Sequence, residues 1–145
     1  VGQVFRTTAD SAMVLLITDS SSSVPVRLSE SRSTGVLHGG GLGGELRIDW
    51  IPLEDQVMEG DVVLTSGLIG EFSGGLQVSR FPQGLVVGRV SDVIRSEAEI
   101  LQQAIVRSEV NFDALEFVFV ITDFPRNDLS GFDNPLGDTD VGGQP

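Results

Sequence analysis

One histidine, one serine and two aspartates are the residues of this chain that best suit nucleophilic catalysis. His38 is the only histidine, Ser66 ends an apolar run, and Asp49 or Asp61 is available to orient an imidazole ring. Small β-barrel proteases carry such triads on loops. However, the glycine-rich run after His38 cannot hold a base to tight geometry, and the chain has no Gly-x-Ser-x-Gly elbow. A turn at a strand end explains Ser66 better.

Other patterns that carry chemistry are incomplete. The acidic residues fall mainly in turns and near the C-terminus, as a solvated surface requires. Asp133, Asp138 and Asp140 lack calcium-loop spacing and the bidentate glutamate. The run of residues 39–44 is too rich in glycine for a phosphate loop and contains no lysine. Because cysteine is absent, thiol chemistry is excluded, and we expect no catalytic residue, no metal and no cofactor.

Composition narrows the class of protein further. The 145 residues are 40% hydrophobic and include 18 glycines, which favours short strands joined by tight turns. The net charge of −12 disfavours binding to nucleic acid. No apolar run is long enough to span a bilayer. The chain opens directly in a strand-like pattern without a methionine, so we expect it to be a fragment of a longer protein.

Hydrophobic patterning predicts about eight or nine short strands and almost no helix, which is typical of a sandwich or barrel. Residues 12–18 form a continuous apolar run that predicts a strand buried on both faces. Residues 24–28 alternate, and Pro25 suggests an edge strand or a strand start. The spacing in residues 96–110 fits a helix and a strand about equally well. The other predicted strands are residues 35–38, 46–50, 62–65, 85–94 and 117–122.

Two β modules are expected, joined near residues 29–34. Residues 1–30 would be the closing part of a first barrel, residues 31–122 a second closed barrel, and residues 123–145 a disordered acidic tail with five aspartates and one arginine. A half barrel exposes strand edges, so we expect residues 1–28 to leave backbone hydrogen-bonding groups unpaired unless another chain pairs with them. The predicted core of the second barrel contains Val36, Ile48, Trp50, Val63, Leu64, Val87, Val90, Val118 and Val120.

A specific signature occupies the middle of the chain. Residues 60–68 read Gly-Asp-x-Val-x-Thr-Ser-Gly-Leu, and residues 81–90 read Phe-Pro-x-Gly-x-x-x-Gly-x-Val. With residues 14–19, 22–27, 35–39 and 111–120, this signature resembles the MreC family of rod shape-determining proteins over most of residues 1–122. The signature residues have structural roles in turns and in close backbone approach. They are Gly60, Asp61, Thr65, Ser66, Gly67, Pro82, Gly84 and Gly88.

The resemblance implies an architecture and a function. Family members have a membrane helix, a coiled coil and two small β-barrels outside the cytoplasmic membrane. The second barrel is of the six-stranded chymotrypsin type without a catalytic triad. The resemblance therefore implies a non-enzymatic scaffold at the extracytoplasmic (periplasmic) face, anchored by a segment absent from this chain. It implies self-association, and binding to MreD and to a penicillin-binding transpeptidase of the peptidoglycan elongation machinery.

One segment departs from the family pattern. Residues 70–80 intervene between the two halves of the signature and look like an inserted flap. Phe72, Leu76, Val78 and Phe81 in or beside it are the expected contact residues for a protein partner, although packing against the chain's own barrel is an equal alternative. Two other functions stay open from the residues alone: a small barrel hydrolase that uses Ser66 and His38, and a generic ligand-binding barrel.

Overall fold

The computed structural model describes residues 1–125 except 43, 69, 72–75, 78–80 and 97. Apart from one 3-10 turn (Phe112–Ala114), the regular structure of these residues is β-strand, and every strand pairing is antiparallel. No helix in the described part of the chain is long or apolar enough to cross a bilayer. The strands are β1 (Gly2–Thr7), β2 (Ala12–Leu16), β3 (Ser23–Leu28), β4 (Thr34–His38), β5 (Leu46–Pro52), β6 (Val62–Thr65), β7 (Gly70–Glu71), β8 (Leu76–Gln77), β9 (Val86–Ile94) and β10 (Leu101–Ser108).

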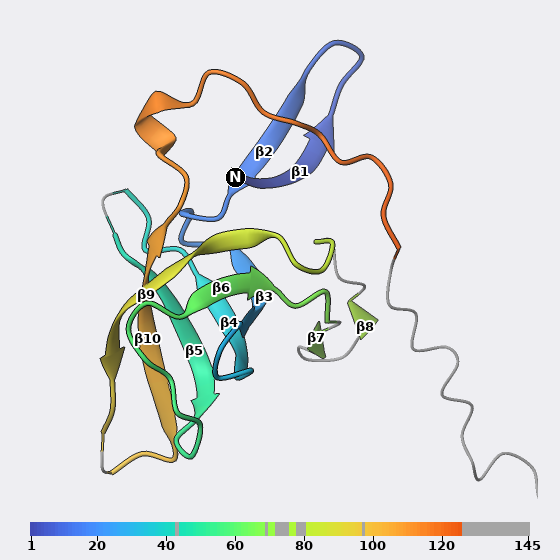
Figure 1. Cartoon of the computed structure of the whole chain (residues 1–145). Helices are drawn as coiled ribbons and strands as arrows, with labels where there is room; N and C mark the ends of the chain where they lie inside the picture. The colour runs from blue at the N-terminus through green and yellow to red at the C-terminus, as the bar shows by residue number, and fades with distance from the viewer. Residues whose placement is uncertain (43, 69, 72–75, 78–80, 97, 126–145) are drawn as a thin grey trace, which may run out of the picture.

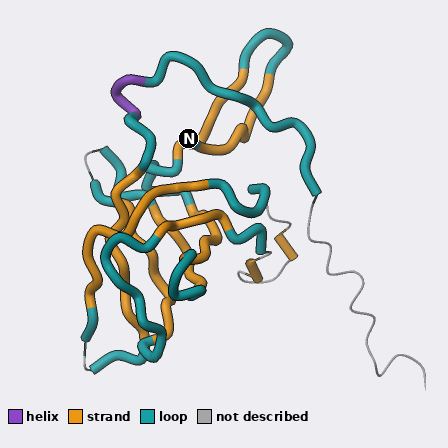
Figure 2. The backbone as a smooth tube through the Cα atoms, viewed as in Figure 1, coloured by secondary structure: helices purple, strands orange, loops and turns teal. Residues whose placement is uncertain are grey.

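Six of these strands form a closed barrel in the order β10-β5-β4-β3-β6-β9, and β9 pairs with β10 to close it (Figures 1 and 2). Closure leaves none of the six with an unpaired edge. The predicted all-β class and the six-stranded closed barrel are confirmed. Of the two alternatives for residues 96–110, the structure contains the strand: β10 pairs with β5 on one side and with β9 on the other.

Alternate residues of the barrel strands point inward and fill the barrel with side chains. Of the predicted core, Val36, Ile48, Val63, Val87 and Val90 are buried. Leu64 is only partly buried, because its neighbours Val63 and Thr65 take the inward positions of β6. The side chains that are almost completely buried are Val24, Val26, Leu28, Leu37, Ile48, Ile51, Val57, Val63 and Gln102.

Strand β3 lies inside the barrel sheet, between β4 and β6. The predicted module boundary at residue 30 is therefore wrong, since residues 23–28 belong to the same barrel as residues 34–108. The expected edge position of Pro25 is wrong for the same reason. Its carbonyl accepts from Ser66 N on the β6 side, just past the end of β6. Proline has no N–H to donate in return, so the ladder of β3 with β6 ends at the pair of Val26 with Thr65.

The β1–β2 hairpin forms a separate two-stranded sheet that projects beyond one end of the barrel (Figure 1). Most of its side chains are exposed, including Phe5 and Met13. The expectation that residues 12–18 form a strand buried on both faces is therefore wrong, and in this run only Ile17 is fully buried. That residues 1–16 help to close a first barrel stays a prediction.

The chain after β10 leaves the barrel. Residues 115–125 have no regular structure, and Phe117, Val118, Phe119 and Val120 are all exposed. The predicted buried strand at residues 117–122, with Val118 and Val120 in the core, is wrong. The reason is that β9 and β10 already close the barrel, which leaves no edge for another strand. Most of the predicted acidic tail, residues 126–145, lies outside the described residues.

Trp50 is 60% exposed, so its predicted core position is wrong. The cause is a β-bulge. In the register of β10 with β5, Gln102 is opposite Ile51 and Ala104 is opposite Ile48, so Asp49 and Trp50 together face Gln103. Trp50 adopts a positive φ of 68°, which lets both isoleucines point inward and turns the indole out. An uninterrupted alternation in residues 46–50 would have placed Trp50 in the core.

Candidate interaction surfaces

The structure does not bring the two residues of the possible hydrolase together. His38 ends β4 and is opposite Ser23 in the register, whereas Ser66 follows β6 and bonds to Pro25. Strand β3 lies between them, which separates their backbones by two strand spacings, about 10 Å. Ser66 is buried, and its hydroxyl accepts from Leu68 N at 3.2 Å. Its surroundings are those of a turn.

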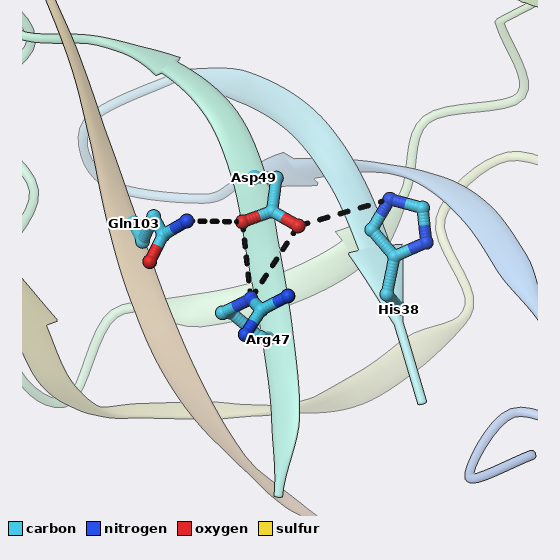
Figure 3. Close-up of polar contacts among 4 residues, drawn as sticks. All are labelled: His38, Arg47, Asp49 and Gln103. Carbon is cyan, nitrogen blue, oxygen red and sulfur yellow. Dashed lines mark hydrogen bonds and ion pairs between the residues drawn. The ribbon is translucent and has the colours of Figure 1, made fainter. Parts of the chain in front are cut away.

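His38 instead faces Asp49 on the outer wall of the barrel, where β4, β5 and β10 meet (Figure 3). Its Nε2 lies 3.9 Å from one carboxylate oxygen of Asp49. The other oxygen accepts from Arg47 Nε at 3.1 Å and from Gln103 Nε2 at 2.8 Å. No group in this cluster is placed as a nucleophile. Chemically, it is a carboxylate fixed by one hydrogen-bond donor on its own strand, Arg47, and one on β10, Gln103.

Trp50 stands next to this cluster and forms the most prominent exposed side chain on that wall. It shares the bulge with Asp49, opposite Gln103, and Gln103 is in turn opposite the half-exposed Ile94 of β9. We call this set of five residues the Trp50 surface: Arg47, Asp49, Trp50, Ile94 and Gln103. A tryptophan beside fixed polar groups is the composition typical of binding hot spots.

Backbone strain marks the same residue. A bulky side chain at positive φ is an outlier that costs free energy, and such residues cluster at functional sites. The sequence contains no signal for this bulge, because the positions that need positive φ are usually occupied by glycine or asparagine. Reasoning from the sequence therefore missed Trp50 as a surface residue.

Asp61 and Thr65 of the signature make hydrogen bonds that hold loops to the barrel. The Asp61 carboxylate accepts from the backbone N–H groups of Glu30 and Ser31, at 2.8 and 3.1 Å. The buried Thr65 hydroxyl donates to Pro82 O at 2.6 Å and accepts from Leu85 N at 2.8 Å. Thr65 thus joins the two halves of the signature across the segment that separates them.

The signature glycines occupy positions where a side chain would be strained. Gly60, Gly67 and Gly84 have φ values of 88°, 65° and 88°. A Cβ on Gly88 would lie 2.1 Å from Arg107 O, so this position requires close approach of two backbones. Together with the hydrogen bonds of Thr65, these glycine conformations show that the signature residues stabilise turns and loops of the barrel.

The expected contact residues of the flap are only partly described. Phe72 and Val78 lie outside the described residues. Leu76 belongs to the short strand β8, which pairs antiparallel with β7 as a separate two-stranded sheet. Phe81 is partly buried and packs against the barrel core. That these four residues contact a partner stays a prediction.

Comparisons with known proteins converge on one family. The family model of the rod shape-determining protein MreC, barrel core, matches residues 1–122. A cell shape-determining protein MreC from Haemophilus influenzae is 33% identical over 79 residues, which are 54% of this chain and 22% of that protein. The chain thus spans less than a quarter of that relative's length. The curated relatives that match the chain are named as cell shape-determining proteins, and not as enzymes.

Solved structures agree. The crystal structure of MreC from Pseudomonas aeruginosa matches with a TM-score of 0.60 and 28% identity, over 74% of this chain and 65% of that one. A complex between a penicillin-binding protein (PBP2) and MreC from Helicobacter pylori matches with a TM-score of 0.50 and 26% identity, over 65% of this chain and 52% of the matched chain. By its sequence match and its barrel, the chain belongs to the MreC family of rod shape-determining proteins.

Proposed function

We propose that the chain is part of a non-enzymatic scaffold that maintains bacterial cell shape by organising the peptidoglycan elongation machinery. Its place would be the extracytoplasmic (periplasmic) face of the cytoplasmic membrane, with an anchor supplied by a part of the protein outside this chain. Family membership supports this proposal. A barrel interior filled with side chains also fits a protein that acts through its outer surface rather than through an internal pocket.

The partner proposed for this chain is a penicillin-binding transpeptidase, with MreD and a second copy of the chain as further partners. The complex of a penicillin-binding protein with the Helicobacter pylori relative supports the first of these. The observation that carries the proposal is the outward position of Trp50 in its bulge. The indole lies outside the core although its backbone conformation is strained. In this position it can bury a large apolar area in a partner's pocket.

Binding to the extracytoplasmic part of the host's penicillin-binding transpeptidase tests the proposal. The wild-type chain, Trp50→Gly and Met58→Ala would each be titrated against the immobilised transpeptidase. Glycine is the appropriate replacement because it tolerates the positive φ of residue 50. Met58 is the matched control, since it is an equally exposed large apolar side chain in the loop between β5 and β6.

We expect Trp50→Gly to weaken binding at least ~30-fold, as loss of a hot-spot tryptophan worth about 2 kcal/mol requires. Met58→Ala should bind like the wild type. Equal affinities for all three proteins would show that the Trp50 surface is not the contact. The absence of binding by the wild-type chain would overturn the transpeptidase as its partner.

A further inference from the structure

A second surface, on strands β3 and β6 and on other residues of β9 and β10, has the composition of a docking site. Strands β3, β6, β9 and β10 present three arginines on their outer faces, with three partly or fully exposed apolar side chains between them. In the strand register Arg27 is opposite Leu64, which is opposite Val86. We call this set of six residues the arginine face: Arg27, Val62, Leu64, Val86, Arg89 and Arg107.

The side chain of Arg27 has a buried nitrogen, Nε, without a hydrogen-bond partner among the described residues. Its guanidinium likewise makes no ion pair with any described residue. The arginines elsewhere whose bonds are described differ: Arg47 bonds to Asp49, and Arg95 bonds to Gln102 and to Val57 O. A buried donor without an acceptor costs stability. Arg27 as a whole is only partly buried and Nε is its one buried atom of this kind, so a carboxylate from outside would pair with the terminal Nη groups.

Arg89 and Arg107 add a second, independent observation. They are directly opposite each other in the pairing of β9 with β10, and like charges in that position are destabilising. Glu109 lies 3.1 Å from Arg89 Nε and compensates one of the two charges. On a chain of net charge −12, three arginines with a single carboxylate partner form a local excess of positive charge.

We propose that the arginine face docks an extended acidic segment of a partner protein, in which carboxylates and apolar side chains take turns at every second residue and so share one face. The arginines would take the carboxylates in bidentate pairs. The apolar residues between them, Val62, Leu64 and Val86, call for apolar side chains on the same face of the ligand. Arg27 and Arg89 lie two strands apart and are offset by two residues along the strands, a separation of about 12 Å. Carboxylates four residues apart on one face of an extended peptide are about 13 Å apart, which matches it.

The inference deepens the proposed scaffold function by assigning a second partner site, and so it rests on that function. The chemistry of the face also admits an anionic phospholipid headgroup. A protein segment is the better match because Val62, Leu64 and Val86 lie in the plane of the barrel wall, between the charges, and not at a protruding edge that enters a bilayer.

The test uses the whole chain and a fluorescent nine-residue peptide in which glutamate and valine alternate at the odd positions, which share one face, and serine fills the even positions. The same peptide with glutamine in place of glutamate is the ligand control. The protein variants are the triple variant Arg27→Gln, Arg89→Gln, Arg107→Gln and the matched control Arg6→Gln, an exposed arginine of β1 on the separate hairpin. Anisotropy titrations would be run at two salt concentrations, with vesicles of phosphatidylglycerol in a parallel arm.

We expect the glutamate peptide to bind the wild type at least tenfold more tightly than the glutamine peptide. The triple variant should lose that difference, whereas Arg6→Gln should keep it. The triple variant should also melt no lower than the wild type, because it removes a like-charge pair and an unpaired buried donor. Thermal unfolding therefore separates loss of binding from loss of fold.

Equal binding of the two peptides, or binding that survives in the triple variant, would overturn the proposal. Binding to the vesicles but not to the glutamate peptide would overturn it as well and would assign the face to lipid. If the triple variant still binds the transpeptidase, the proposed scaffold function stays intact. If Trp50→Gly loses transpeptidase binding but still binds the glutamate peptide, the two surfaces serve different partners. The two claims therefore fail separately.

Discussion

The side chains of Ile48 and Ile51 both lie in the barrel core with no exposed surface, although they are three residues apart in one strand. An uninterrupted strand would place them on opposite faces. The bulge at Asp49 and Trp50 absorbs the mismatch, so burial of two isoleucines and exposure of one tryptophan have a single cause.

Replacement of Trp50 by glycine tests the strain in the bulge. Glycine adopts a φ of 68° without the Cβ penalty, and the lost indole is mostly exposed. We expect Trp50→Gly to leave the free energy of unfolding unchanged or to raise it by up to ~1 kcal/mol. Trp50→Val should lower it, because a β-branched residue is disfavoured at positive φ. Urea unfolding measures both, and a clear loss of stability in Trp50→Gly would show that the indole packs as core.

Thr65→Val tests the hydrogen bonds that join the two halves of the signature. Valine has the shape of threonine but leaves Pro82 O and Leu85 N without the partner that they have now. We expect a loss of about 2 kcal/mol in the free energy of unfolding. Thr65→Ser keeps the hydroxyl and should lose less. A valine variant as stable as the wild type would mean that these bonds do not hold the loop.

Hydrogen exchange compares the hairpin with the barrel. The β1–β2 sheet has only two strands and is largely exposed, whereas β9 is paired on both sides. We expect backbone amides of residues 2–16 to exchange much faster than those of residues 86–94 in a monomeric sample. Comparable protection in a proven monomer would contradict the expectation that the hairpin is only part of a larger module.

How far the sequence predicts this molecule depends on where its strands are regular. Short apolar runs bounded by turn residues correctly located β4, β6 and β9. The pattern was ambiguous in β10, where the register shifts twice against its neighbours. It was misleading at Trp50, since a bulge changes the face without changing any residue type. Burial of Gln102 was also unpredictable, because its amide nitrogen donates to Pro52 O at the end of β5 and to Asp55 O in the loop that follows, both far away in the sequence.

Closure of the barrel explains the errors at its two ends. Residues 117–122 have an ideal strand composition, but composition does not specify a pairing partner. Because β9 and β10 pair with each other, no edge of the barrel is open to these residues. Residues 23–28 were separated from their barrel because a polar linker follows them, although β3 pairs on both sides. Among the candidate site residues, the signature positions were recognisable by resemblance, whereas both arginine and tryptophan surfaces depend on a register that only the fold supplies.

The turn between β2 and β3 provides a pH-dependent observable. The pKa of the Asp19 carboxyl lies below its ordinary value, because its carboxylate accepts from the Ser21 hydroxyl and from Ser21 N. Since the pKa is lower in the folded chain, this contribution to stability is complete above the unfolded pKa and is lost as pH falls through the folded one. An NMR titration should show that Ser21→Ala raises the pKa of Asp19. An unchanged pKa in that variant would exclude the hydroxyl as the cause.

The central claim is that the protein is a scaffold that acts through the outer wall of its barrel. Cell shape in living bacteria tests this claim most directly. The full-length protein carrying Trp50→Gly would replace the wild type in the host bacterium, with Met58→Ala as the control and immunoblots to show equal protein levels. The account predicts that cells with Trp50→Gly round up, while cells with Met58→Ala stay like the wild type. Normal cell shape in the Trp50→Gly strain at equal protein level would contradict it.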